Sequence, residues 1–300
     1  MISWLLVIIL AYFFFSLASL GDKLVLNRKA DPAVYTFYVG FFSILLAVII
    51  PFINFRFPDA KTLVWIIAEA GVYLPGLYLM YIAVNKFEVS KVITTIGATQ
   101  PVFIFALTWI FWGPQTMTAK VILAFIILLS GSIIISVEKN INLTADYLKI
   151  TILASLMFSL DYIFSKFVFS SMTFWQGFIW MRIFISLFSL LFLISRKNRK
   201  AIFAKQTVSD KKTGAIFALT QMSGGTANIL QSFAIFLAPV AFLPVINSLR
   251  GAQYVFLFLI TLFLSVFLPK ILKEKISKTA IVQKIISIIL ISAGLAILIF

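Results

Sequence analysis

The sequence predicts an all-α membrane protein whose ten transmembrane helices form two inverted-topology repeats of five. Three observations support this prediction. Hydrophobic residues make up 62% of the chain and charged residues 12%, and the mean hydropathy is +1.09. The apolar residues fall into ten long runs. In addition, FSLASLGDKLV at 15–25 and FSLDYIFSKFV at 158–168 are identical at five of eleven positions.

Each apolar run is long enough to cross a bilayer once, which takes about 20 mostly apolar residues. A soluble domain of 300 residues could not bury this much apolar surface, whereas a bilayer can. The first run has neither a basic leader nor a small-residue cleavage site, so we expect it to be retained as a helix. The ten expected spans are 2–20, 33–53, 62–84, 92–112, 118–137, 147–169, 174–195, 214–238, 240–267 and 279–299.

The net charge of +15 is concentrated in the connections between spans. Seven Lys and Arg residues lie within 196–212, and four lysines lie within 270–278. Short basic loops beside helix ends follow the positive-inside rule, so the charge does not indicate nucleic-acid binding. We expect a multi-pass protein of the cell (inner or plasma) membrane, with membrane lipid and a small solute as partners and no nucleic acid.

The chain contains no cysteine and no histidine. Disulfides, thiolate nucleophiles, histidine bases and His-ligated metal sites are therefore excluded. Only Glu69 and Asp161 are carboxylates well inside the expected spans, and neither has the flanking residues of an intramembrane aspartyl protease. We expect no enzyme activity, no catalytic residue, no metal and no cofactor.

The similarity of 15–25 and 158–168 divides the chain into an expected first repeat, 1–143, and a second repeat, 144–300. SGSII at 130–134 and AGLAI at 293–297 match in the last helix of each repeat. Because five is odd, the second repeat must enter the membrane with the opposite orientation. Eighteen Lys and Arg residues follow odd-numbered spans and three follow even-numbered ones, so the basic side alternates as inversion requires. Many secondary transporters are built this way; chance similarity of two apolar helices is the alternative.

Similar polar stripes occur in the first span of each repeat. The first contains Tyr12, Ser16, Ser19 and Lys23, and the other contains Ser155, Ser159, Tyr162 and Lys166. At helical spacing each set lies on one face. Two interpretations remain open: the stripes line a polar cavity, or the hydroxyls join neighbouring helices while the lysines reach the headgroups.

Three further spans carry polar residues at helical spacing. In 214–238 the residues favour a cavity wall, because amides and glycines have little reason to face lipid. In 240–267 a deeply placed Arg250 needs a carboxylate, carbonyls or an anionic ligand, and Pro239 and Pro244 predict an irregular first turn. In 92–112 we expect Pro101 to break the helix. The stripes are Gln221, Gly224, Gly225, Asn228, Gln231 and Ser232; Asn247, Arg250, Gly251 and Tyr254 with Gln253 beside them; and Thr94, Gly97, Ala98 and Pro101.

The two membrane carboxylates allow two interpretations. Glu69 lies in the third span with Tyr73 and Gly76 on its face, and Asp161 lies in the middle of the sixth span. Either could carry a proton as the coupling ion. Either could instead be the structural partner of Arg182 or Arg250.

Several tracts together resemble the drug/metabolite transporter superfamily, EamA-like branch. They are AVNKFEVSKVITTIGATQPVF at 83–103, AIFLAPVAFLPVINSLRGAQYVF at 234–256, KEKIS at 273–277, and the glycines of SG at 130–131 and AG at 293–294. The resemblance covers the whole chain. It implies an alternating-access carrier with both termini in the cytoplasm, whereas the loop charges place both termini outside.

We expect a permease for a small organic solute, such as an amino acid or related metabolite, acting as a monomer or homodimer. A carrier of an anionic, phosphorylated or lipid-linked metabolite is the first alternative, and a membrane assembly factor without transport activity is the second. Glu69 and Asp161 are the candidate proton carriers. The candidate solute contacts are Gln221, Asn228, Asn247, Arg250, Gln253, Tyr78 and Tyr81.

Overall fold

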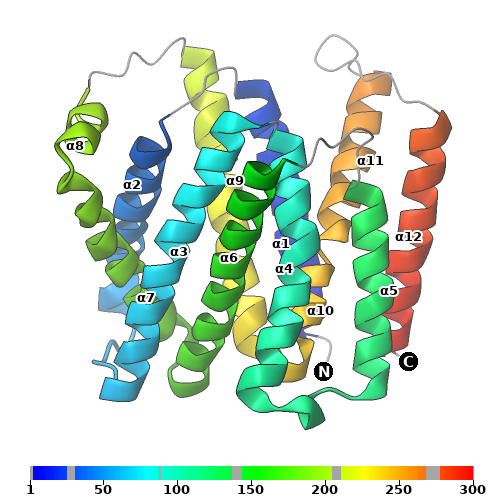
Figure 1. Ribbon diagram of the computed structural model, residues 1–300, viewed down its shortest axis with the longest axis horizontal. Coiled ribbons are helices and arrows are strands. Elements are labelled where there is room, and N and C mark those ends of the chain that lie inside the picture. Colours follow the sequence, from blue (N-terminus) through cyan, green and yellow to red (C-terminus); the bar gives the residue numbers. More distant parts are fainter. Residues whose placement is uncertain are drawn as a thin grey trace. The chain divides into compact units, whose positions relative to one another are not determined.

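The computed structural model describes residues 3–25, 31–87, 89–136, 144–204, 211–267 and 278–299, and these residues form helices without any strand (Figure 1). Short 3₁₀ segments extend or precede several of the α-helices. The α-helices are α1 (Ser3–Val25), α2 (Pro32–Phe42), α3 (Ala60–Lys86), α4 (Val89–Trp112), α5 (Ala119–Ser136), α6 (Ala145–Ser171), α7 (Phe174–Ser189), α8 (Arg196–Ile202), α9 (Lys211–Leu237), α10 (Leu243–Ser248), α11 (Gly251–Phe267) and α12 (Lys278–Ile299).

Eight helical segments within the described residues are long and apolar enough to cross a membrane. They overlap eight of the ten expected spans, and α5 contributes a shorter apolar helix over Ala119–Ile135. The remaining expected span, 214–238, corresponds to the 27-residue helix α9. The chain is therefore an α-helical, multi-pass membrane protein, and the prediction of all-α structure is confirmed.

Two expectations about helix irregularity have different outcomes. The span 240–267 begins with a 3₁₀ turn at Val240–Phe242, followed by α10 and α11, so the expected irregular start after Pro239 is confirmed. The expected break at Pro101 is wrong, because α4 runs without interruption from Val89 to Trp112. A proline inside a membrane helix is tolerated where local adjustment or neighbouring groups satisfy the freed carbonyl.

Helix starts at three places are determined by local side-chain chemistry. Asp31 caps α2 by accepting hydrogen bonds from the backbone N–H groups of Ala33 and Val34, and Pro32 occupies the first turn. Asp59 caps α3 and accepts from both the N–H and the hydroxyl of Thr62. The Thr144 hydroxyl accepts from the N–H of Tyr147 at the start of α6. Each cap satisfies backbone donors that the helix leaves unpaired.

The helices form two compact units. Unit 1 comprises α1, α5 and α9 to α12, and unit 2 comprises α2 to α4 and α6 to α8. Each unit combines helices from both expected repeats, 1–143 and 144–300.

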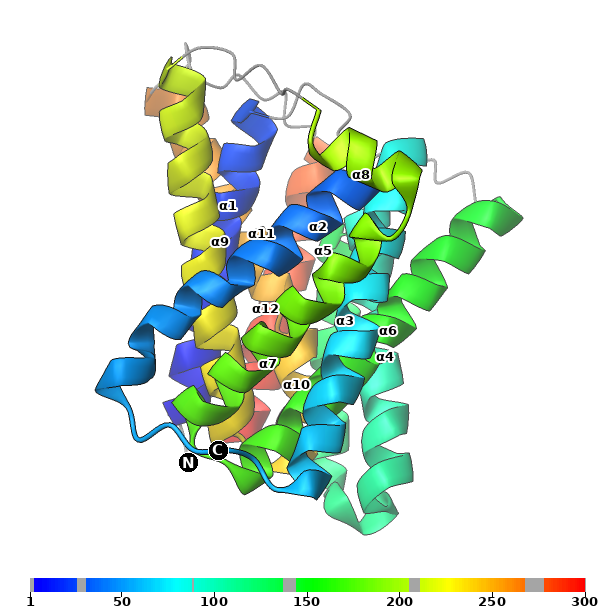
Figure 2. The same ribbon diagram turned by 90° about the vertical axis from the view of Figure 1, so that its left-hand side faces the viewer.

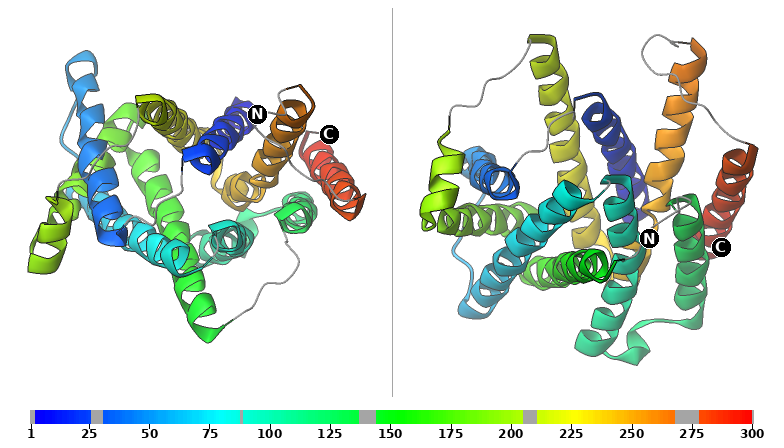
Figure 3. Two further views of the ribbon diagram at one scale, coloured as in Figure 1. Left: turned by 90° about the horizontal axis from the view of Figure 1, so that it is seen from above. Right: turned by 45° about the horizontal axis from the view of Figure 1, so that its top comes forward.

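In unit 1, α1 lies along α9 and α5 lies along α12 (Figures 1 and 3). The α5–α12 contact depends on two glycines. A Cβ on Gly294 would lie 2.6 Å from the Cγ of Leu128, and one on Gly131 would lie 3.0 Å from Ile291. These are the glycines that the sequence matched between the two repeats, and small residues are what allow membrane helices to approach closely.

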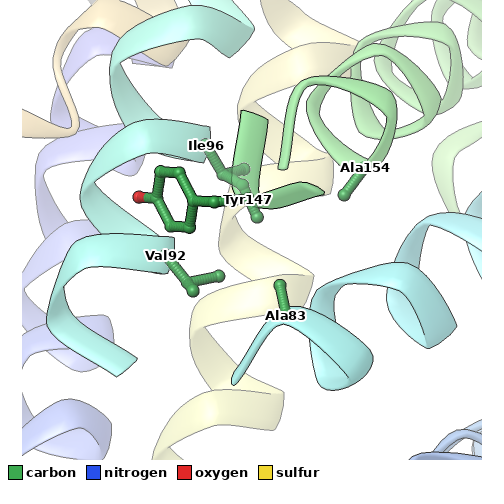
Figure 4. Packing of buried hydrophobic residues seen from close by; sticks show 5 residues of the cluster. All are labelled: Ala83, Val92, Ile96, Tyr147 and Ala154. Carbon is green, nitrogen blue, oxygen red and sulfur yellow. The ribbon is translucent and has the colours of Figure 1, made fainter. Parts of the chain in front are cut away.

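In unit 2, α3 lies along α6, and α7 packs on α2 and α3 (Figure 2). Tyr147 of α6 points into a buried cluster that includes Val92 and Ile96 of α4 and Ala83 of α3 (Figure 4). Its hydroxyl donates to the carbonyl of Lys91 at 2.8 Å and shares a hydrogen bond with Thr95. The phenol thus joins the starts of α6 and α4.

Candidate functional site

Unit 2 contains a buried group of ionisable residues from three helices. Glu69 of α3 is 0% exposed and lies in electrostatic contact with Asp161 of α6 and Arg182 of α7. The carboxyl groups of Glu69 and Asp161 are close enough to interact electrostatically. Within the described part of the chain, neither oxygen of Glu69 has a hydrogen-bond donor. Charged side chains inside a membrane span are costly, so a group of this kind is a functional-site candidate.

Aromatic rings position the cation of this group. The guanidinium of Arg182 lies 4.8 Å from the ring centre of Phe178 and 5.5 Å from that of Tyr73. The carbonyl of Arg182 accepts a hydrogen bond from Ser43 at 2.9 Å. Arg182 is thus the cation that faces both acids. The structure brings Glu69 and Asp161 together as candidates, and Arg182 is the arginine that interacts with them within unit 2.

The hydroxyls of the two polar stripes join neighbouring helices. In unit 1, Tyr12 donates to the carbonyl of Ile246 at 2.8 Å, and Ser19 accepts from the amide of Gln253 at 3.0 Å. In unit 2, Ser155 accepts from Thr99 at 2.8 Å, and Ser159 donates to the Gln100 carbonyl at 3.2 Å. The packing interpretation therefore holds for these hydroxyls. Lys166 is 7% exposed, and the side chain of Lys23 lies outside the described residues.

Unit 1 contains a broken helix. The chain turns at Leu249 and Arg250 between α10 and α11. Ser132 of α5 bridges this break, because its hydroxyl donates to the carbonyl of Ser248 and accepts from the N–H of Gly251 at 3.0 Å. A Cβ on Gly251 would collide with Ser132. The break is therefore a packed feature of the fold whose backbone groups are paired by protein.

Three polar side chains lie at or beside this break, and two of them, Asn247 and Tyr254, have buried polar atoms without a hydrogen-bond partner among the described residues. Asn247 is 0% exposed, and among the described residues neither its Oδ1 nor its Nδ2 has a hydrogen-bond partner. The buried hydroxyl of Tyr254 also lacks a hydrogen-bond partner among the described residues. The half-buried guanidinium of Arg250 interacts electrostatically with Tyr254. An amide, a hydroxyl and a guanidinium are the donors with which proteins bind carboxylates.

The seven expected solute contacts divide between the units. Asn247 and Arg250 lie at the break, and Gln253 is 9% exposed and already bound to Ser19. Gln221 and Asn228 of α9 are exposed, whereas Ala227 and Ala234 of the same helix are 0% exposed.

The two tyrosines belong to unit 2 and contact aromatic rings there. Tyr78 packs edge-on against Phe192 with ring centres 5.4 Å apart, and Tyr81 packs on Tyr35 at 5.1 Å. The structure therefore does not group them with the five residues of unit 1.

Sequence reasoning missed the roles of Ser132, Tyr254 and Tyr73. Ser132 follows Gly131 in SGS at 130–132, but its role depends on a contact with a residue 116 positions away. The helical spacing of the sequence places Tyr254 on the face of Arg250 and Tyr73 on the face of Glu69. Tyr254 lies beside Arg250 in the same segment of the chain, whereas the contact of Tyr73 with Arg182 joins α3 to α7 and appears only in the structure.

Comparison with known proteins identifies the fold but no family. No protein-family model matches this chain, and no curated protein matches it. A solved structure described as "Crystal structure of protein" aligns with a TM-score of 0.64 over 98% of this chain and 96% of that chain, at 14% sequence identity. At this identity the match shows the fold alone.

Proposed function

We propose that this protein is a secondary permease of the cell membrane that carries a small organic solute with a carboxylate, such as an amino acid or related metabolite, by alternating access. One observation carries the proposal: the wholly buried amide of Asn247 lacks a partner among the described residues and lies near Arg250, where α10 and α11 separate. Burying an unpaired amide costs about 1–3 kcal/mol in proteins. A ligand that satisfies the amide gives this cost a functional reason.

The side chains at the break match the polar end of an amino acid. Arg250 and Tyr254 supply donors for a carboxylate. Asn247 has both a free donor and a free acceptor among the described residues. Its Nδ2 can donate to the carboxylate, and its Oδ1 can accept from the neighbouring ammonium group. A phosphate uses the donors but leaves Oδ1 unpaired, which favours an amino acid over a phosphorylated metabolite.

The helix pairing within each unit supports the inverted repeat behind this proposal. The repeat equates α1 with α6 and α3 with α9. The α1–α9 pair of unit 1 therefore becomes the α6–α3 pair of unit 2, and both pairs are in extended contact. Inverted repeats with discontinuous helices at the binding site are a recurrent design of secondary transporters. The broken α10–α11 helix has that character.

The decisive experiment is uptake by proteoliposomes. Purified protein is reconstituted, and accumulation of labelled amino acids and of phosphorylated metabolites is compared with that in empty liposomes. We expect saturable amino-acid uptake that Asn247→Ala reduces about tenfold or more, because a hydrogen bond to a charged group contributes about 1.5–3 kcal/mol. Asn198→Ala, at a half-buried position of the short helix α8 in unit 2, is the matched control.

Thermal stability separates a binding role from a structural one. In the empty protein, Asn247→Ala removes an unpaired buried amide, so we expect the melting temperature to stay equal or rise while uptake falls. Uptake at the wild-type rate would refute the solute contact. Uptake confined to phosphorylated solutes would support the alternative of an anionic metabolite carrier. Uptake of neither amino acids nor phosphorylated metabolites would favour an assembly factor.

A further inference from the structure

We propose that Glu69 and Asp161 form one proton site, in which the two carboxyl groups share a single proton and Arg182 balances the remaining negative charge. The site depends on the proposed function only for its use, which is to couple solute movement to a proton gradient. The proton site itself is argued from the geometry of unit 2.

The first argument is the hydrogen-bonding state of Glu69. Its carboxyl group is wholly buried, and both oxygens lack a donor among the described residues. An ionised carboxylate is an acceptor at both oxygens, so a buried one normally receives several hydrogen bonds. Glu69 is buried but receives no hydrogen bond from the described residues. A proton on the pair supplies the missing donor.

The second argument is the proximity of the two acids. Glu69 and Asp161 are close enough to interact electrostatically, and two ionised carboxylates have no hydrogen to place between them. One proton converts this repulsive contact into an O–H···O⁻ hydrogen bond, which is among the stronger kinds. Two carboxyl groups in contact that share one proton are a known chemical arrangement.

The third argument is charge balance inside the membrane. With both acids ionised, the group of two carboxylates and Arg182 has a net charge of minus one. With one proton its net charge is zero, and with two protons it is plus one. A low-dielectric surrounding favours the neutral state because uncompensated buried charge is costly. The favoured state therefore holds one proton.

The elements packed around Glu69 bring few other titratable groups to the site. Tyr73 lies on α3 itself, α6 contributes Asp161, and α7 contributes Arg182. The tyrosines of α2, Tyr35 and Tyr38, contact Tyr81 and the Ile202 carbonyl instead. Lys166 of α6 lies five residues beyond Asp161 and so on another face of the helix.

The proton site lies where three helices meet, which gives it a way to act on conformation. Glu69, Asp161 and Arg182 come from α3, α6 and α7, and α3 packs against both of the others. Loss of the proton leaves two repelling carboxylates and a net negative charge in this contact. Movement of these helices, or admission of water, would relieve it. Protonation therefore biases the protein between two arrangements.

The primary test counts protons on the purified protein and needs no solute. Infrared spectra over a pH range follow the C=O band of protonated carboxylic acid, with hydrogen–deuterium exchange for assignment. We expect the band to correspond to one buried acid per chain at pH 7. Zero or two buried acids per chain at pH 7 would overturn the proposal. Asp59→Asn, outside the membrane spans, is the control and should leave the band unchanged.

Single substitutions test whether the two carboxyl groups share one proton. Glu69→Gln or Asp161→Asn should abolish the band at pH 7, since the remaining carboxylate balances Arg182 one to one. Arg182→Gln should raise the band to two acids per chain, because both carboxyl groups then need neutralisation. These changes have opposite signs, so general unfolding cannot imitate the set. A band that persists in both acid variants would contradict a shared proton.

Transport assays then distinguish failure of this proposal from failure of the proposed function. With a pH gradient, wild-type proteoliposomes should accumulate solute, whereas Glu69→Gln should equilibrate or exchange solute without accumulating it. Transport that ignores the gradient, in protein without the one-proton band, refutes the proton site and leaves the permease intact. A one-proton band in protein that moves no solute supports the site and refutes the permease.

Discussion

The proposed repeat makes counterparts of two sets of helices, which are α1, α9 and α11 of unit 1 and α6, α3 and α4 of unit 2. The two sets differ in the polar residues that they carry. Both sets use hydroxyls to join helices, through Tyr12 and Ser19 in one and Ser155 and Ser159 in the other. Among the described residues, only unit 2 has acidic side chains in the middle of its helix pair, α3 and α6. The residue 143 positions before Asp161 is Ala18.

The contacts of this alanine extend the comparison. Gly224 of α9 lies beside Ala18, where a Cβ added to the glycine would be 3.8 Å from that of the alanine. In unit 2, Glu69 of α3 lies beside Asp161. A glycine–alanine contact thus corresponds to an acid pair. Under the proposed repeat, the packing of the helix pair is kept, whereas the chemistry at its centre differs and gives one charged unit and one amide-rich unit.

The largest expected effect comes from removing the arginine of each unit. Arg182→Gln removes the cation that balances the acids of unit 2, so both carboxyl groups must take up a proton to remain buried, and breaking a buried ion group costs about 3–5 kcal/mol. Arg250→Gln should cost much less stability but should reduce uptake strongly. Thermal unfolding and proteoliposome uptake measure the two effects. The destabilisation by Arg182→Gln should be smaller at pH 5 than at pH 8, because protons then neutralise the acids. Equal destabilisation by both variants would remove the distinction between the units.

The next effect concerns the helix break that distinguishes α10–α11 from the continuous α4. Gly251→Ala places a Cβ against Ser132 and should cost about 1–3 kcal/mol through overpacking. Gly225→Ala is the matched control, because a Cβ there meets no described atom within 4 Å, and alanine favours helix by about 1 kcal/mol. We expect melting temperatures to change in opposite directions. A harmless Gly251→Ala would show that Ser132 does not need this close approach.

Eight of the ten expected spans match helices that are long and apolar enough to cross a membrane, because a span has a minimum length and an apolar composition, and both are local properties. The break could not be located in the same way. Pro101 is a local signal of irregularity, yet α4 continues through it. The actual break, at Leu249 and Arg250, depends on a hydroxyl from α5 that pairs the freed backbone groups. A break inside a membrane protein needs a partner, and the sequence of the breaking segment does not show it.

The candidate site, like the fold, could be predicted from the sequence only in part. Polar residues inside apolar spans identified Glu69, Asp161 and Arg250 as functional candidates, because such residues are expensive in lipid. The sequence left open which arginine is close to the acids, and the contact of α7 with α3 brings Arg182 to them within unit 2. The polar stripe of α9 predicted a cavity wall. The structure leaves Gln221 and Asn228 exposed.

A smaller effect tests whether the two units use their hydroxyls equally. Tyr12→Phe removes the hydrogen bond to the Ile246 carbonyl, and Ser159→Ala removes the bond to the Gln100 carbonyl. Each loss should lower the free energy of unfolding by about 1 kcal/mol. The control is Ser130→Ala, whose exposed hydroxyl bonds only within its own helix. A large effect in one unit alone would mean that the repeated stripe no longer serves the same purpose.

The smallest effect compares the starts of the paired helices α3 and α6 within unit 2. Hydrogen bonds from Thr62 hold the pKa of Asp59 below its usual value of 3.8, so this cap stabilises α3 above that pH and loses its effect as the pH falls through the lowered pKa. The neutral Thr144 cap of α6 has no such dependence. Amide hydrogen exchange, expressed as protection factors, should therefore show the first turn of α3 opening in acid before that of α6. Asp59→Asn keeps a capping oxygen but removes the charge, so it should make the two helix starts respond alike. If α3 still opened first in this variant, the carboxylate of Asp59 would not be the source of the difference.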